Sequence, residues 1–272
     1  MFKLILVMIF NRVLIYPLKR FTQPIRDDGP KSHLQKRHVP TFGGLIILGL
    51  TLLQYLIHGI GCHTVTQVMI GFGLLGLYDD LKKVYFKSSK GISAKGKFLL
   101  QWILGLGIAY QLNVSSVVDL FGYGVDLSFG YPLFASFVMV AYSNAYNLTD
   151  GIDGLASSQA FILLLFLGAV AIGQGRSDIL EMILILSASI LGFFSVNCHP
   201  ARIFMGDVGS LAIGALLGYF SIILKVEMWF AVASLLLIAE TVSVILQVWV
   251  YKRKRIRLFK MAPFHHHLEL SG

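Results

Sequence analysis

The sequence has little charge and almost no cysteine. Of its 272 residues only 14% are charged and 56% are hydrophobic, whereas charged residues make up about 25% of an ordinary soluble domain. The two cysteines, Cys62 and Cys198, lack metal-ligand spacing and are expected at opposite membrane faces, which disfavours a zinc site and a disulfide. The longest polar segments are about twenty residues. These shortages exclude a soluble domain of useful size.

Most of the chain consists of long stretches that carry no charged residue. A membrane-spanning helix needs about 20 mainly apolar residues, and the chain offers nine candidates: Met1–Leu18, two helices between Arg37 and Asp79, Phe98–Val118, Leu127–Thr149, Gly154–Gly175, Met182–Ala201, Val208–Leu224 and Met228–Tyr251. We therefore expect an all-α, polytopic membrane helix bundle that forms one integral membrane domain over residues 1–272. A cleaved secretory signal is the alternative for the first segment, but no small-residue cleavage site follows it.

The basic residues indicate the orientation of this bundle. With nine spans and an external N-terminus, nineteen Lys and Arg residues fall in internal segments and three in external ones, a strong positive-inside bias. The net charge of +9 is therefore attributed to topology and to contacts with anionic lipid of the bilayer. Nucleic-acid binding is disfavoured because no aromatic-interleaved basic fold accompanies the charge. The longest external connection, residues 113–131, alternates apolar residues with Gly and Asp and is typical of a small hairpin.

The acidic residues gather at the predicted internal ends of the spans. In GLYDDLKK, Asp79 and Asp80 close the third span. Adjacent carboxylates on a helix point about 100° apart, so they need not share a ligand, and a salt bridge with Lys82 or Lys83 at the membrane boundary is an alternative to a catalytic role.

A second acidic stretch is NAYNLTDGIDGLAS, in which Asn144 and Asn147, and likewise Asp150 and Asp153, are three residues apart. Helix N-capping would explain one acid and leave three polar residues unused, so we favour a cation or nucleotide site. In FMGDVGSLAIG, Asp207 precedes a charge-free span, and N-capping and ligand binding are both compatible with it.

Two further segments add groups that suit an anionic ligand. The first internal loop carries Lys36 and Thr41 before paired glycines, and the C-terminal APFHHHLELSG carries His265, His266 and His267. Three consecutive histidines on a helix cannot all face one zinc ion, so a histidine that faces a phosphate or pairs with a carboxylate is expected.

Together these segments place carboxylates from three parts of the chain at one membrane surface. Carboxylates so close repel one another unless a cation lies among them, and Mg2+ takes oxygen ligands that it often shares with substrate phosphates. A metal-dependent phosphate reaction at the membrane surface follows as a hypothesis.

These segments, with AETVSVILQV, resemble in order and spacing the phospho-N-acetylmuramoyl-pentapeptide-transferase family of bacterial peptidoglycan synthesis. That family belongs to the polyprenyl-phosphate N-acetylhexosamine-1-phosphate transferase superfamily, whose mark is the aspartate motifs, whereas PFHHHLELSG is specific to the muramoyl branch. The match runs from about Pro24 to Gly272. It departs from the family at His38-Val39, where Gly-Thr is usual, and the family usually has a further helix after the histidine loop.

The resemblance implies a Mg2+-dependent reaction in the bacterial inner membrane, with the catalytic loops on the cytoplasmic side. Undecaprenyl phosphate would attack UDP-N-acetylmuramoyl-pentapeptide to give lipid I and UMP. The sequence leaves open whether Asp79 forms a covalent phospho-enzyme or only assists direct attack, and we favour direct attack. By motif, Asp79, Asp80, Asp207 and His265 match catalytic positions, with Asp207 as the metal ligand. Matching substrate-binding positions are Lys36, Thr41, Lys97, Asn144, Asn147, Asp150, Asp153, Phe204, Gln247, His266 and His267. A homodimer is expected from the resemblance alone.

Several alternatives remain open. A related UDP-N-acetylglucosamine-1-phosphate transferase is disfavoured by the histidine triplet, and a secondary transporter is disfavoured because the acids cluster at the inner ends of the spans and no repeat is seen. A catalytically inactive polyprenyl-phosphate-binding homologue is the third alternative. Glu240, inside the last span, is interpreted mainly as a hydrogen-bonded interhelical contact, with a supporting role behind the active site as the alternative.

Overall fold

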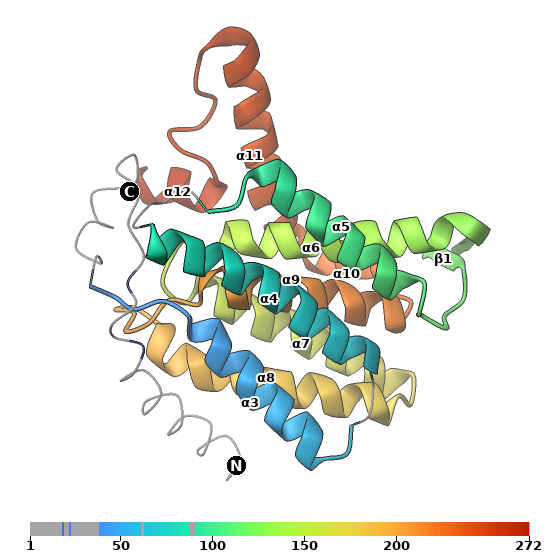
Figure 1. Cartoon of the computed structure of the whole chain (residues 1–272). Helices are drawn as coiled ribbons and strands as arrows, with labels where there is room; N and C mark the ends of the chain where they lie inside the picture. The colour runs from blue at the N-terminus through green and yellow to red at the C-terminus, as the bar shows by residue number, and fades with distance from the viewer. Residues whose placement is uncertain (1–17, 19–21, 23–37, 61–62, 87–90, 272) are drawn as a thin grey trace.

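The computed structural model describes residues 18, 22, 38–60, 63–86 and 91–271. In this part of the chain the fold is a helix bundle with one short β-hairpin (Figure 1). The bundle helices are α3 (Gly43–Ile57), α4 (His63–Tyr85), α5 (Ala94–Ala109), α6 (Tyr131–Thr149), α7 (Leu155–Gly173), α8 (Ser177–Asn197) and α9 (Gly206–Ile223). They are followed by α10 (Glu227–Ala233), α11 (Leu235–Lys254) and α12 (Phe264–Glu269).

The predicted helical segments are found with two changes. Four helices, α7, α8, α9 and α11, are long and apolar enough to cross a membrane, which supports a membrane protein; the count of nine spans stays a prediction, and its first helix lies outside the described residues. The predicted span 228–251 is broken between α10 and α11 at Ser234, whose hydroxyl donates to the Phe230 carbonyl and contacts the Tyr142 hydroxyl. Such side-chain bonds compete with the regular helical pattern.

The other change is at residues 113–131. Helix α5 ends at Ala109, short of the predicted Val118, because residues 117–126 form the predicted hairpin. Strands β1 (Val117–Leu120) and β2 (Tyr123–Asp126) pair antiparallel, and the one-turn helix η1 (Ser128–Gly130) leads into α6.

Helix α9 is the centre of the bundle. It is 89% buried over its apolar window and contacts α3, α4, α6 and α7. Glycine makes its closest crossing possible, because a Cβ on Gly44 of α3 would overlap the backbone of Gly209. Burial of an apolar helix on all sides explains why α9 shows no polar face.

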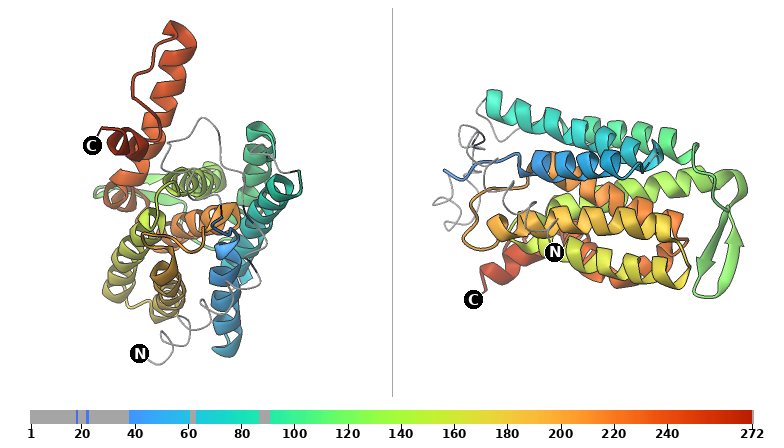
Figure 2. Two further views of the ribbon diagram at one scale, coloured as in Figure 1. Left: turned by 90° about the vertical axis from the view of Figure 1, so that its left-hand side faces the viewer. Right: turned by 90° about the horizontal axis from the view of Figure 1, so that it is seen from below.

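The two ends of the bundle differ. The helices run roughly side by side, with the hairpin at one end and the α8–α9 loop and α12 at the other (Figure 2). Helix α11 projects from the body of the bundle (Figure 1), and only 17% of its apolar window is buried. The end opposite the hairpin is where the predicted acidic segments meet.

Candidate active site

Two acids come from the last turns of α4. Asp79 and Asp80 are fully buried although they lie near a helix end. Helix α4 packs so tightly on α9 that a Cβ on Gly76 would overlap the backbone carbonyl of Asp207. Asp80 Oδ2 accepts the N–H of Val208 at 3.1 Å and thereby satisfies one of the free amides at the start of α9. Packing and hydrogen bonding thus fix α4 to the first turn of α9.

These contacts create an acid cluster, the group Asp79, Asp80 and Asp207. One ligand oxygen from each lies within 4.8 Å of the others, so the neighbouring aspartates do share a site, despite the divergence of adjacent helical positions. The capping interpretation of Asp207 is wrong: Met205 is the N-cap residue, and Asp207 lies in the first turn. A carboxylate there interacts favourably with the helix dipole.

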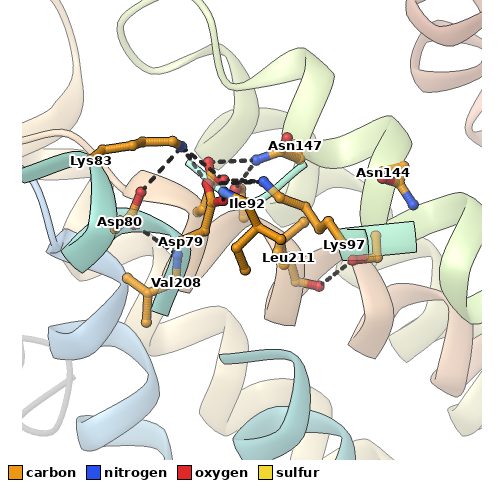
Figure 3. Close-up of polar contacts among 12 residues, drawn as sticks. Asp79, Asp80, Lys83, Ile92, Lys97, Asn144, Asn147, Val208 and Leu211 are labelled. Atoms are coloured by element: carbon orange, nitrogen blue, oxygen red, sulfur yellow. Dashed lines mark hydrogen bonds and ion pairs between the residues drawn. The ribbon is translucent and has the colours of Figure 1, made fainter. Parts of the chain in front are cut away.

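Two lysines lie against the acid cluster and offset part of its negative charge (Figure 3). Lys83 Nζ lies 2.7 Å from Asp79 Oδ2, 3.0 Å from Asp207 Oδ2 and 3.6 Å from Asp80 Oδ1. Lys97 Nζ, from the first turn of α5, lies 3.0 Å from Asp79 Oδ2 and 2.6 Å from Asp207 Oδ2. The boundary salt bridge expected for Lys83 is therefore present, and it belongs to the candidate site itself.

The loop before α5 closes over Asp79. Its Oδ1 accepts the N–H of Ile92 at 2.5 Å, and a Cβ on Gly91 would overlap the Asp79 carboxylate. Only a residue without a side chain leaves room for the carboxylate there. Both oxygens of Asp79 therefore have donors: the backbone on one side and the two lysines on the other.

The two asparagines of α6 have different surroundings. Asn147 donates from Nδ2 to Asp207 Oδ1 at 3.0 Å and to Ser210 at 2.8 Å. Asn144 instead donates to Gln101 Oε1 at 2.8 Å, within a buried polar chain between α5 and α6. The structure thus joins Asn147, but not Asn144, to the acid cluster by a direct hydrogen bond.

The two acids between α6 and α7 also differ. Burial, and then the charges of the nearby acid cluster, raise the pKa of Asp150 from 3.8 to about 7. Asp153 accepts the N–H of Ala201 at 3.1 Å and lies 3.2 Å from His199 Nδ1, so it fixes the α8–α9 loop. It does not cap α7, whose N-cap residue is Gly154.

The same loop carries Phe204. Its N–H donates to the Pro40 carbonyl at 2.8 Å, and its carbonyl accepts from Gly43 at 2.9 Å. Thr41 is fully buried and faces Gly206, on which an added Cβ would lie 2.8 Å from Thr41 Oγ1. Thr41 and Phe204 are therefore held beside the start of α9.

The histidine triplet lies in α12 and packs against the turn that contains Asp150 and Gly151. His265 and His266 are buried, and a Cβ on Gly151 would overlap His265 Nε2. On its other side His265 Nδ1 lies 3.1 Å from Glu240 Oε2. Glu240 thus contacts another helix, as expected, and its partner is the histidine predicted to be catalytic.

Gln247 and His267 hold the chain that leads to the histidines. Gln247 Oε1 accepts the N–H groups of Leu258 and Phe259, and His267 Nδ1 accepts the N–H of Lys260 at 3.2 Å. Their polar atoms bind the backbone of residues 258–260, so without substrate these two side chains stabilise the segment before α12.

The structure brings together several of the predicted site residues and adds one that the sequence analysis did not assign to the site. Asp79, Asp80, Asp207, Lys97 and Asn147 meet through direct contacts. Lys83 was assigned only charge compensation, although its place one helical turn after Asp79 was a usable signal. Lys36 lies outside the described residues.

Comparisons with known proteins point in one direction. Residues 63–225 match the model of glycosyl transferase family 4. A phospho-N-acetylmuramoyl-pentapeptide-transferase of Caldanaerobacter subterraneus is 40% identical over 260 residues, which cover 93% of this chain and 82% of the relative. Proteins of the same name from Streptococcus agalactiae (38%, covering 100% of this chain and 87% of the relative) and a Wolbachia strain (41%, covering 95% and 85%) are similarly close.

Proposed function

The chain belongs to glycosyl transferase family 4, among its phospho-N-acetylmuramoyl-pentapeptide-transferases, and from this membership we propose the reaction and the role of each residue. The enzyme is a phosphotransferase. It transfers phospho-N-acetylmuramoyl-pentapeptide from the UDP conjugate to undecaprenyl phosphate, giving lipid I and UMP. The observation that carries the proposal is the meeting of Asp79, Asp80 and Asp207 within 4.8 Å at one end of the bundle.

The acid cluster fits a magnesium site. Its donors are carboxylate oxygens, the ligands that Mg2+ prefers, and two ammonium groups lie against them in the protein alone. Asp207 would be the principal ligand, with oxygens of Asp79 and Asp80 in reach. When bound, Mg2+ neutralises charge on the phosphate oxygens of the substrates.

The surroundings of Asp79 support direct attack by the lipid phosphate. Both carboxylate oxygens accept close donors, the Ile92 N–H and two lysine ammonium groups. A carboxylate engaged in this way is a weak nucleophile, so its role is to hold Lys83 and Lys97. Transfer between phosphates depends mainly on positioning and charge stabilisation, which do not require a covalent phospho-enzyme.

The remaining residues bind and orient the substrates. Lys97 and Lys83 place positive charge where the diphosphate and the lipid phosphate would meet, and Asn147 fixes the orientation of Asp207. The Asp150 turn and Phe204, close to the start of α9, form the nucleotide side of the site together with Thr41 and Asp153. Lys36 receives a substrate-binding role from the family motif alone.

The same geometry supports the proposed membrane setting. The acid cluster lies at one end of the helices, where a phosphate headgroup would reach it while the lipid tail stays in the bilayer. The excess of Lys and Arg in the predicted internal segments assigns this end to the cytoplasmic face of the bacterial inner membrane. A homodimer is part of the same proposal.

Release of UMP by the purified protein tests the proposal. The assay uses detergent, UDP-N-acetylmuramoyl-pentapeptide, undecaprenyl phosphate and Mg2+. Asp207→Asn should abolish turnover, because it removes the principal ligand charge and the partner of both lysines. Asp178→Asn is a matched control, since Asp178 lies at the opposite end of α8 and pairs with Arg176, and it should keep near-normal turnover.

Other results would contradict the proposal. Turnover with UDP-N-acetylglucosamine alone would indicate the sibling activity. Retained lipid-phosphate binding without turnover of either nucleotide sugar would indicate an inactive homologue. Near-normal turnover by Asp207→Asn would show that Asp207 is not a metal ligand.

A further inference from the structure

Glu240 is an acid in the apolar stretch of a helix that is mostly exposed. Glu240 is only 3% exposed, although most of α11 is not buried: 17% of its apolar window is buried in the protein. An ionisable group within a membrane span costs a few kcal/mol and usually has a functional partner. The position of Glu240 therefore calls for an explanation beyond packing.

Its carboxylate contacts one residue at two points. Glu240 Oε2 accepts the backbone N–H of His265 at 3.1 Å and lies 3.1 Å from Nδ1 of the same residue. The second contact is within ion-pair distance, although Nδ1 is not aligned for a hydrogen bond. The backbone bond fixes where α12 begins, and the carboxylate then lies beside one edge of the imidazole.

The other edge of the ring faces the candidate active site. His265 Nε2 is buried and finds no hydrogen-bond partner in the part of the chain that the structure describes. It lies against Gly151, next to Asp150, and the His266 ring is 4.2 Å away between centroids. Buried polar atoms are normally satisfied, so Nε2 is available to a group that enters beside this turn.

We propose that Glu240 is a positioning residue for His265. The carboxylate keeps a proton on Nδ1 and holds the ring so that Nε2 points to the turn at Gly151, where a substrate phosphate oxygen would arrive. Because the two ring nitrogens are distinct, the partner of one decides what the other offers. This role rests on the proposed phosphotransfer and assigns to Glu240 no contact with substrate.

Glu240→Gln separates positioning from simple structure. The glutamine oxygen still accepts the His265 N–H, so the fold is retained while the charge beside Nδ1 is lost. Removal of a group that orients a reactive side chain typically costs 10–100-fold. We expect kcat to fall by about that factor with little change in KM and melting temperature. Ser243→Ala is the control, because Ser243 is equally buried on α11 and should leave kcat unchanged.

Two further measurements exclude a merely structural role. The 15N shifts of the His265 ring, assigned by comparison with His265→Asn, should show the Nδ1 proton in the natural protein and a changed tautomer balance in Glu240→Gln. In the His265→Asn background, Glu240→Gln should cause no additional loss, because Glu240 acts through that ring.

Three results would overturn the inference: unchanged kcat in Glu240→Gln, identical His265 shifts in both proteins, or full additivity of the two substitutions. The inference and the proposed function fail separately. If the natural protein releases no UMP from either nucleotide sugar, the proposed function is wrong, while the 15N shifts still decide whether Glu240 controls the His265 ring.

Discussion

Replacement of Lys83 by methionine tests how the acid cluster is held together without metal. Lys83 Nζ lies within 3.0 Å of both Asp79 and Asp207, and its side chain is only 17% exposed. Methionine fills much of the same space without charge. Of the lysines that the structure describes at the cluster, the substitution leaves only Lys97 beside the three carboxylates.

The expected loss of stability is large for one side chain. Removing one partner of a buried ion pair typically costs 3–5 kcal/mol, because a charge is left buried without compensation. We take about 3 kcal/mol, since the rim of the cluster is partly exposed. For a chain of this size that corresponds to a fall in melting temperature of roughly 6–12 °C in buffer that contains EDTA.

Magnesium should reverse most of this loss. A divalent cation among the carboxylates restores the positive charge, so the rise in melting temperature between EDTA and saturating Mg2+ should be larger in Lys83→Met than in the natural protein. Differential scanning fluorimetry in detergent measures both. Lys82→Met removes the same charge one residue earlier and should leave the melting temperature and the Mg2+ response nearly unchanged.

The reasoning is refuted by either of two results. In EDTA, Lys83→Met could have the same melting temperature as the natural protein, which would mean that the cluster does not need the Lys83 ammonium group. Alternatively it could melt lower by the same amount with and without Mg2+, which would mean that the metal and Lys83 do not serve the same carboxylates.

Three further predictions concern the surroundings of the cluster. Gly76→Ala should lower the free energy of unfolding by about 1–3 kcal/mol, because the added Cβ overlaps the Asp207 backbone; an unchanged denaturation midpoint would contradict the close packing. Gly91→Ala should reduce UMP release at least tenfold, an estimate based on misplacement of a reacting group, since its Cβ overlaps the Asp79 carboxylate; normal turnover would show that the loop is not needed. Because the fold raises the pKa of Asp150 to about 7, this group destabilises the folded protein by an amount that is absent below about pH 4, grows up to about pH 7 and is constant above it. The melting temperature of Asp150→Asn in EDTA should therefore exceed that of the natural protein increasingly from pH 5 to pH 7 and by a constant margin above pH 7, and a difference that does not change between pH 5 and pH 7 would argue against the shift.

The sequence predicted the elements better than their contacts. Charge-free runs predicted the long helices because apolar length is a local property, and the alternation after Asn113 predicted the hairpin. The break at Ser234 was not predicted, because it depends on Tyr142, which is 92 residues away and meets the serine only in the folded bundle. Likewise, the local sequence left N-capping and ligand binding both open for Asp207, and only the packing of α4 on α9 brings it to Asp79.

In the candidate site, too, contacts between residues far apart in the sequence could not be predicted, as its two lysines show. The spacing from Asp79 to Lys83 is a local signal, whereas the reach of Lys97 to the same oxygens depends on how α5 packs against α4 and α6. Asn144 and Asn147 illustrate this most clearly: they share a motif and a helix, yet one turns to Gln101 and the other to Asp207. Motif position therefore identified the neighbourhood of the site, and only packing separated groups in contact with the acid cluster from groups that support the helices.

The balance of charge in the cluster gives a physical reason for the proposed metal dependence. Among the described residues, three carboxylates face two ammonium groups, Lys83 and Lys97, so the site holds together without metal but keeps one formal negative charge if all five groups are ionised. Two phosphate-bearing substrates would add several more negative charges, which the lysines cannot neutralise while they remain paired with Asp79 and Asp207. If a divalent cation takes over the carboxylates, both ammonium groups become free to face the phosphates. On this argument the lysines serve the aspartates before substrates bind and the phosphates afterwards, so the same two side chains account for stability in the empty enzyme and for charge stabilisation during transfer.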